Sequence, residues 1–318
     1  MTKEVIFLHP VFKEKIWGGD KLNTIYGYDI PSDKTGEAWV ISAHDHGASI
    51  VESGPYKGKD LSQLWDEERE LFNRAQTDDS AYPLLVKIID ANDDLSVQVH
   101  PDDRYAQDVE KVPFGKTECW YILDAKEDSS IILGHTAKDK AELDEMIDKG
   151  QWDDLLQTVP VKKGDFFYVP SGTIHAIGKD VVILEIQQSS DITYRVYDYD
   201  RIEDNGQKRE LHIDKSKEVT TVPHQAPSFA GDIRVNEGLE SEKLIEEAYF
   251  TVYRWTLNGQ AKENVSKDFL QVSVIGGQAS LTIDGKEMTI ESGQHFIIPH
   301  GVETFTLDGQ AELIVSHT

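Results

Sequence analysis

The sequence predicts a mainly β protein that contains two copies of one small double-sheet domain, with a small helical insertion in the first copy. Short apolar or alternating runs, separated by Gly, Pro and Asp, recur along most of the 318 residues, which is typical of β-sandwiches and barrels. One turn motif begins at Gly164 and again at Gly293, an offset of 129 residues. Similarity at so large an offset indicates a duplicated domain and not a solenoid.

Composition and charge narrow the classes of function. The chain has 58 acidic and 32 basic residues, a net charge of −26, so we expect neither nucleic acid nor a membrane as a partner, because both need a cationic surface. A local cluster of Lys and Arg can still bind a small anion. The single cysteine, Cys119, excludes an intrachain disulfide and fits a reducing cytoplasm. We find neither a signal peptide nor a transmembrane segment at the start, and therefore expect a cytoplasmic protein.

The first third of the chain contains short strands and one helix. The helix is predicted at residues 61–73, because Leu61, Leu64, Trp65 and Leu71 recur with charged residues between them, which is the pattern of an amphipathic helix.

The strands of the first copy follow. Residues 83–91 form a nearly continuous apolar strand, whereas residues 95–101 alternate, so that Ser96, Gln98 and His100 share one face. Further strands are expected at residues 118–125, 129–135, 166–169, 181–187 and 193–200, the first two of them as a hairpin.

Helical periodicity and Gly150 predict two short helices at residues 138–159, inserted between strands. Residues 201–228 are polar and are the best candidate for a linker. We therefore predict a catalytic domain at residues 1–225, with its insertion at about 138–159, and a C-terminal domain at residues 226–318.

The repeated turn has the form G-x5-P-x-G-x2-H at residues 164–175 and, with Thr304 in place of the histidine, at residues 293–304. This spacing resembles the second signature of the cupin superfamily, which are small jelly rolls. We therefore expect two cupin-type jelly rolls. Since the second copy has Thr304 where the first has His175, we expect it to keep the fold without metal ligands.

A metal site needs partners for His175. Gln98 and His100 lie on one face of their strand, and Glu118 is the next carboxylate, at the start of the strand 118–125. Two imidazoles, a carboxylate and an amide oxygen suit one Zn²⁺ per chain, and less tightly Fe²⁺, Mn²⁺ or Co²⁺. Without the turn motif, Gln98 and His100 would be better explained as solvent-facing polar side chains on an antiparallel strand. The turn motif at residues 164–175 reverses this and favours the metal.

A second histidine pair, His44 and His46, lies in the turn-like stretch AHDHG and has no carboxylate at the expected spacing. We interpret these two as solvated turn histidines.

Several segments resemble the type I mannose-6-phosphate isomerases in their short bacterial form. They are residues 15–18 (KIWG), 36–39 (GEAW), 83–88 (PLLVKI), 95–102 (LSVQVHPD), 116–118 (KTE), 164–175 and 185–195 (EIQQSSDITYR). The resemblance implies a metal-dependent aldose–ketose isomerase that interconverts mannose 6-phosphate and fructose 6-phosphate through a cis-enediol. It places zinc ligands on Gln98, His100, Glu118 and His175, the essential arginine on Arg195, and substrate contacts on Ser96 and Lys116. The family commonly reads S-D-N-V-x-R where this chain has residues 190–195, SDITYR.

The implied reaction needs a base near C1 and C2, a group that stabilises the enediolate, and an anchor for the phosphate. For the base we favour Glu185, because burial raises the pKa of a glutamate toward the useful range, with Asp191 and Lys116 as alternatives. A surface position of Glu185 on a half-solvated strand fits the pattern equally well. Arg195 is expected to bind the phosphate or the enediolate as a fork, although it could also pair with nearby surface aspartates.

Two functions of other classes stay open. A cupin Fe(II) dioxygenase would use two histidines and one glutamate as a facial triad, and a non-enzymatic cupin would bind a sugar without turnover. Gln98 beside His100, together with the cations Lys116 and Arg195, favours an anionic sugar. The oligomeric state stays open between monomer and dimer.

Overall fold

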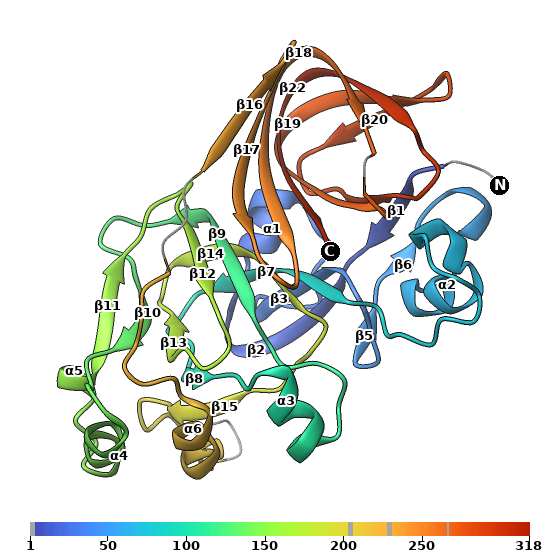
Figure 1. Ribbon diagram of the computed structural model, residues 1–318. Helices are drawn as coiled ribbons and strands as arrows, with labels where there is room; N and C mark the ends of the chain where they lie inside the picture. The colour runs from blue at the N-terminus through green and yellow to red at the C-terminus, as the bar shows by residue number, and fades with distance from the viewer. Residues whose placement is uncertain (1–3, 203–205, 228–230, 266) are drawn as a thin grey trace.

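The computed structural model describes residues 4–202, 206–227, 231–265 and 267–318. It is mainly β, as predicted, and Figure 1 shows a jelly roll of two facing sheets below a second, strongly curved sheet.

Two sheets form the first jelly roll. The six-stranded sheet has the order β12 (Phe166–Val169), β9 (Glu118–Ala125), β14 (Val181–Gln188), β7 (Leu84–Ala91), β3 (Thr35–Ile41) and β2 (Val11–Gly19). The five-stranded sheet has the order β11 (Leu156–Pro160), β10 (Ser130–His135), β13 (His175–Ile177), β8 (Val97–Val99) and β15 (Tyr194–Tyr197). Buried side chains of both sheets, such as Trp120 and Ile183 from one and Ile131 and Ile177 from the other, form one cluster between them.

The predicted hairpin between residues 118–125 and 129–135 is wrong. Strand β9 pairs with β12 and β14, whereas β10 pairs with β11 and β13, in the opposite sheet. Both edges of β9 are occupied by those neighbours, so the chain crosses from one sheet to the other after Ala125.

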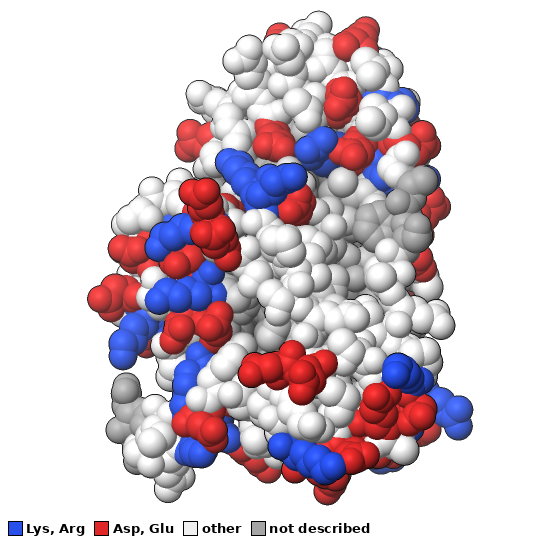
Figure 2. Space-filling model, turned by 90° about the vertical axis from the view of Figure 1, so that its left-hand side faces the viewer, with Lys and Arg blue, Asp and Glu red and all other residues white. Residues whose placement is uncertain are grey.

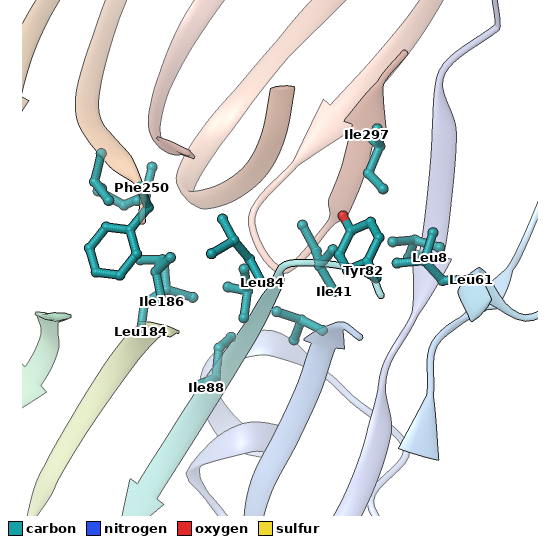
Figure 3. Packing of buried hydrophobic residues seen from close by; sticks show 14 of the residues in the cluster. Leu8, Ile41, Leu61, Tyr82, Leu84, Ile88, Leu184, Ile186, Phe250 and Ile297 are labelled. Carbon is teal, nitrogen blue, oxygen red and sulfur yellow. The ribbon is translucent and has the colours of Figure 1, made fainter. Parts of the chain in front are cut away.

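The six-stranded sheet is buried on both faces. All residues of β7 and β14 are buried, because the face opposite the five-stranded sheet packs against the second copy. Figure 3 shows Phe250 of the second copy near Leu184 and Ile186, and all three belong to one buried cluster with Ile297. Burial on both faces explains why these strands are almost continuously apolar.

The second copy is a nine-stranded sheet. Its order is β16 (Asp232–Asn236), β17 (Leu239–Glu246), β18 (Thr251–Asn264), β22 (Thr304–His317), β19 (Leu270–Ile283), β21 (His295–Ile298), β1 (Ile6–His9) and β6 (Ile50–Val51), with β20 (Lys286–Glu291) paired to β19. Strand β1 pairs with β21, with Ile6 opposite Ile297. The predicted division at residue 225 stays a prediction, and β1 and β6 extend the sheet of the second copy across it.

The helices and short elements lie between these strands. They are α1 (Lys21–Tyr26), β4 (Ala43–His44), β5 (Gly47–Ala48), η1 (Gly54–Tyr56), α2 (Leu61–Glu67), η2 (Arg69–Phe72), α3 (Asp103–Tyr105), η3 (Ala106–Glu110), α4 (Lys140–Asp148), α5 (Trp152–Leu155) and α6 (Ile213–Val219). The helix predicted at residues 61–73 is confirmed as α2 followed by η2, and the Asp60 side chain caps α2 in a capping box with Gln63.

The expectations for the insertion at residues 138–159 and the linker at residues 201–228 hold in part. The two inserted helices at residues 138–159 are confirmed as α4 and α5, but this range ends in strand β11. The proposed linker at residues 201–228 contains α6. Its Ile213 and Val219 pack on a buried cluster of strands β8 and β15, a tertiary contact that the polar sequence of this segment does not signal.

The repeated turn has the same backbone in both copies. Gly164 and Gly172 have φ of +90° and +83°, and Gly293 and Gly301 have +89° and +87°, a region that favours glycine. The histidine position differs, because His175 is 1 % exposed whereas Thr304 is exposed. The turn therefore belongs to the fold of both copies.

An aromatic cluster links the segment after β6 to the second copy. The Phe72 ring lies 5.0 Å from that of Trp65 and 5.3 Å from that of Phe269. Phe72 is fully buried, so we expect Phe72→Ala to lower the free energy of unfolding by about 3–5 kcal/mol, measured by denaturant titration. Val235→Ala is the control, because Val235 is 67 % exposed and should change it by less than about 0.5 kcal/mol. Equal effects of the two substitutions would contradict this packing.

On the face shown in Figure 2, Lys and Arg side chains lie beside Asp and Glu, and mainly uncharged residues cover its middle. Among the described residues, no helix is long and apolar enough to cross a membrane.

Candidate active site

The sequence-predicted site residues converge between the two sheets of the first jelly roll. In the five-stranded sheet, Gln98 of β8 lies opposite His175 of β13 on one side and Arg195 of β15 on the other. In the six-stranded sheet, Glu185 of β14 lies opposite Lys87 of β7. Strand alternation points these residues into the space between the sheets.

His100, Glu118 and His175 form a buried cluster. They are 1 %, 0 % and 1 % exposed, and one donor atom from each lies within 4.8 Å of the others. His175 Nε2 is 3.4 Å from Glu118 Oε1, and His100 Nε2 is 3.6 Å from Glu118 Oε2.

The protonation of His175 suits a metal ligand. Its Nδ1–H donates to the carbonyl oxygen of Thr173 at 2.8 Å, so the lone pair is on Nε2. This atom faces the carboxylate and has no hydrogen-bond partner in the part of the chain that the structure describes. Burial lowers the pKa of His175 to about 4 and that of His100 well below its ordinary value. Both rings are therefore neutral near pH 7, as metal ligation requires.

Lys116 adds a cation to this cluster. Its Nζ lies 2.9 Å from Glu118 Oε2 and 3.1 Å from His100 Nε2. Burial alone would lower the pKa of Lys116, but the carboxylates of Glu118 and Glu185 raise it above its ordinary value. The ammonium thus contacts two of the three donor groups, and this position favours positive charge.

Gln98 lines the adjacent cavity. The strand register brings it beside His175, and direct ligation by its amide oxygen stays a prediction.

Glu185 is buried, at 2 % exposure, so it is not the surface residue that its strand pattern also allowed. Its Oε1 lies 3.5 Å from Lys87 Nζ, and its Oε2 accepts a hydrogen bond from Trp120 Nε1 at 3.1 Å. The same indole N–H donates to Glu118 at 3.0 Å. Burial, and next the charge of Glu118, raise the pKa of Glu185.

Arg195 lies at the edge of this site. Its Nε donates to Ser96 Oγ at 3.3 Å, and one terminal nitrogen donates to the carbonyl oxygen of Glu210 at 2.8 Å. Asp198, the surface partner that the sequence also allowed, is bound instead by Arg201 and Arg209.

Asp191 contacts both histidines of the AHDHG stretch. His44 Nε2 lies 3.6 Å from one carboxylate oxygen, and His46 Nδ1 hydrogen-bonds to the other. The stretch is a turn between β4 and β5, as predicted. The sequence has no carboxylate at the expected spacing from these histidines, but the tertiary structure brings Asp191 near them, 145 residues after His46.

The three donor atoms of His44, His46 and Asp191 also lie within 4.8 Å of one another. However, His44 Nδ1 accepts the backbone N–H of His46 at 3.1 Å. The neutral ring therefore carries its proton on Nε2, which faces Asp191. Two of the cluster's polar groups thus have hydrogen-bond partners within the chain, His44 Nδ1 with the His46 backbone N–H and His46 Nδ1 with Asp191.

A cavity of about 220 Å³ adjoins the buried cluster. Its lining carries five cations, Lys15, Lys87, Lys116, Arg195 and Arg209, and three carboxylates, Glu37, Glu185 and Asp191. The local charge therefore opposes the net charge of −26, as binding of a small anion requires.

The lining residues that sequence reasoning did not assign to the site include Lys15, Glu37, Trp39 and Arg209. Lys15 Nζ lies 3.0 Å from Glu37 Oε1. Burial would raise the pKa of Glu37, but Lys87 and Lys15 lower it to about 2. The segments 15–18 and 36–39 could have pointed to Lys15, Glu37 and Trp39, because both segments belong to the family resemblance. No local feature of the sequence marks Arg209.

Comparison with known proteins gives consistent matches along the chain. Residues 5–121 match the family model of the phosphomannose isomerase type I catalytic domain, and residues 240–318 match that of the mannose-6-phosphate isomerase cupin domain. The chain is 50 % identical over 317 residues to mannose-6-phosphate isomerase ManA of Bacillus subtilis, covering 100 % of both chains. It is also 50 % identical over 315 residues to the mannose-6-phosphate isomerase of Streptococcus mutans, covering 99 % of this chain and 98 % of that protein.

Solved structures agree with these matches. The crystal structure of the mannose 6-phosphate isomerase from Bacillus subtilis superimposes with a TM-score of 0.95, at 48 % identity and 99 % coverage of both chains. Phosphomannose isomerase from Salmonella typhimurium gives a TM-score of 0.80 at 15 % identity, which shows the shared fold.

Proposed function

Since this chain belongs to the type I mannose-6-phosphate isomerase family, we propose that it interconverts mannose 6-phosphate and fructose 6-phosphate in the cytoplasm. The observation that carries the proposal is the buried group of His100, Glu118 and His175 beside a cavity rich in cations. A sugar phosphate needs both features, because its phosphate is anionic and its reacting carbons carry oxygens that gain negative charge.

We propose that His100, Glu118 and His175 hold one Zn²⁺, with Gln98 as the fourth ligand. The donor set fits, because two neutral imidazoles and a carboxylate are common ligands of catalytic zinc. When bound, the ion would act as a Lewis acid that stabilises negative charge on the substrate oxygens.

Glu185 is the proposed base. Its carboxylate takes the proton from C2 of the open-chain aldose, and C1 receives a proton as the cis-enediol collapses to the ketose. Trp120 holds this carboxylate by a hydrogen bond of 3.1 Å. Burial and the charge of Glu118 raise the pKa of Glu185, which makes its carboxylate a stronger base than that of an exposed glutamate.

The two rival bases take other roles in this proposal. Lys116 has a raised pKa, so it stays protonated and stabilises negative charge on the enediolate oxygens. Asp191 has a lowered pKa, because burial is outweighed by its contacts with His46 and His44. Its ion pairs position it at the rim of the cavity.

Arg195 is proposed to bind the phosphate or the enediolate through its guanidinium group. Its Nε donates to Ser96 Oγ at 3.3 Å and one terminal nitrogen donates to the carbonyl oxygen of Glu210 at 2.8 Å, and these contacts hold the permanently charged guanidinium at the cavity. Arg209 lines the same cavity and adds positive charge there.

Removal of the metal tests the function. Treatment with a chelator is expected to abolish the conversion of mannose 6-phosphate to fructose 6-phosphate, and added Zn²⁺ should restore it. A coupled assay of fructose 6-phosphate measures the rate, and buffer exchange without chelator is the control. Activity that is indifferent to both chelator and zinc would refute the metal site. Oxygen consumption restored by Fe²⁺ instead would indicate a dioxygenase, and sugar binding without turnover under any metal would indicate a binding protein.

A further inference from the structure

The second cupin copy has kept a cavity at the place where the first copy has its active site. This cavity measures about 270 Å³, compared with about 220 Å³ for the first. Its lining includes Tyr253, Trp255, Asn264, Leu270, Val315 and His317. The strand registers of the two copies show that four of these positions, Tyr253, Asn264, Leu270 and Val315, correspond to those of the active site.

The first correspondence comes from the repeated turn. Val169 and Ile298 hold the same place in the two turn motifs, 129 residues apart. Val169 lies opposite Glu118, and Ile298 lies opposite Leu270. Leu270 therefore takes the place of the carboxylate that faces both histidines in the first copy.

The end of the turn gives the second correspondence. His175 lies opposite Gln98, and Thr304, at the equivalent position, lies opposite Asn264. An amide has thus been kept at one position, while the imidazole has been lost at the other.

The neighbouring strands continue this register. Ile186 lies opposite Cys119, one residue after Glu118, and Ser316 lies opposite Gln271, one residue after Leu270. Glu185 precedes Ile186 by one residue, and Val315 precedes Ser316 by one residue, so Val315 takes the place of Glu185.

Across the next strand pair, Glu185 lies opposite Lys87, and Val315 lies opposite Tyr253. Tyr253 therefore takes the place of Lys87. The ion pair beside the active site has become an aliphatic and an aromatic residue, and the cavity has remained.

Two buried polar atoms in this lining have no hydrogen-bond partner among the described residues. They are Trp255 Nε1 and His317 Nε2, and their residues are only 7 % and 3 % exposed. His317 Nδ1–H donates to the carbonyl oxygen of Thr318 at 2.9 Å, so Nε2 is an acceptor, whereas the indole N–H of Trp255 is a donor. Buried groups of this kind are rarely left unsatisfied.

We infer that this cavity is a second, metal-free binding site for a monosaccharide. A hydroxyl group both donates and accepts, so sugar hydroxyls suit a lining that holds an unpaired donor, Trp255 Nε1, and an unpaired acceptor, His317 Nε2. The C–H face of a sugar ring can pack on an aromatic side chain, which Tyr253 supplies. Lys267 also lines the cavity and is placed to bind a phosphate if the sugar carries one.

Binding to the full chain tests this inference, with D-mannose and mannose 6-phosphate as probes and inorganic phosphate as a third ligand. Calorimetry is performed on Arg195→Ala, which weakens the proposed catalytic site, and on the same protein with Trp255→Phe added. We expect sugar binding in the first protein and a Kd at least about tenfold higher in the second, because one buried hydrogen bond is lost.

A control variant and a second test variant make the result specific. Trp152→Phe removes an indole N–H of α5, whose ring stacks on Tyr197 at 4.7 Å outside the cavity lining, and it should not change binding. Asn264→Ala is a second test variant, for use if Trp255→Phe does not fold. It alters the cavity at an exposed position and should also raise the Kd of the sugar.

If the site takes a phosphate, Lys267→Ala should weaken the binding of mannose 6-phosphate and of inorganic phosphate, but not the binding of mannose. Equal Kd values with and without Trp255→Phe and Asn264→Ala, or no sugar binding in the Arg195→Ala protein, would overturn the inference. Isomerase activity of Trp255→Phe alone is measured separately. Retained activity with no second binding event rejects this site and leaves the proposed function intact.

Discussion

Replacing His175 with alanine is expected to remove the bound metal and to lower kcat/KM for mannose 6-phosphate by more than about 10²-fold. Loss of an outer-sphere partner of a metal ligand already costs 10- to 100-fold, and His175 offers a donor atom itself, with Nε2 3.4 Å from Glu118. Metal content, measured by mass spectrometry after purification, and the rate of isomerisation check this result.

The chain provides a matched control for this experiment, because Thr304 occupies the same place in the second copy of the turn. Thr304 is exposed, so Thr304→Ala should leave metal content and rate unchanged. Full metal content in His175→Ala, or metal loss in Thr304→Ala, would show that the metal lies elsewhere. Circular dichroism of both variants establishes that the turn, which needs its glycines and not its last residue, is retained.

Replacing Glu185 with glutamine should lower kcat by about 10²- to 10⁴-fold with a much smaller change in KM, since this is the usual contribution of a positioned base. Glutamine has the same shape, and its carbonyl oxygen can still accept the Trp120 N–H that now donates to Glu185 at 3.1 Å. Steady-state kinetics in both directions measure the effect, and metal content shows whether the neighbouring cluster is intact.

Asp191→Asn tests the carboxylate that is the alternative to Glu185, the favoured base. Asp191 is bound to His44 and His46, with a lowered pKa, so its loss should raise KM more than it lowers kcat. If instead kcat falls by 10²-fold or more in Asp191→Asn and hardly changes in Glu185→Gln, the base is Asp191 and our assignment is wrong.

Much of the fold was predictable because its signals are local. Alternation at residues 95–101 predicted the strand that carries Gln98 and ends one residue before His100, and the spacing of Gly and Pro predicted the repeated turn, whose glycines have left-handed φ values. The hairpin predicted for residues 118–135 failed because strand pairing is decided by long-range neighbours, and β12 and β14 occupy both edges of β9.

The candidate site shows the same limit. The family resemblance pointed to His100, Glu118 and His175, which the structure brings together. Three other features had no local signal in the sequence, because each depends on a contact between residues far apart in the chain. They are Arg209 in the cavity lining, the ion pairs of Asp191 with His44 and His46, and the packing of helix α6.

By itself, the sequence determined that the cupin-type turn occurs twice and that only the first turn ends in a histidine, His175, because the spacing of Gly, Pro and His is a property of one short segment. Only the tertiary structure decided that Glu185 is buried beside Trp120 and that the second copy retains a cavity with other chemistry. Both depend on which strands lie opposite one another, and pairing across a sheet joins residues that no sequence window contains.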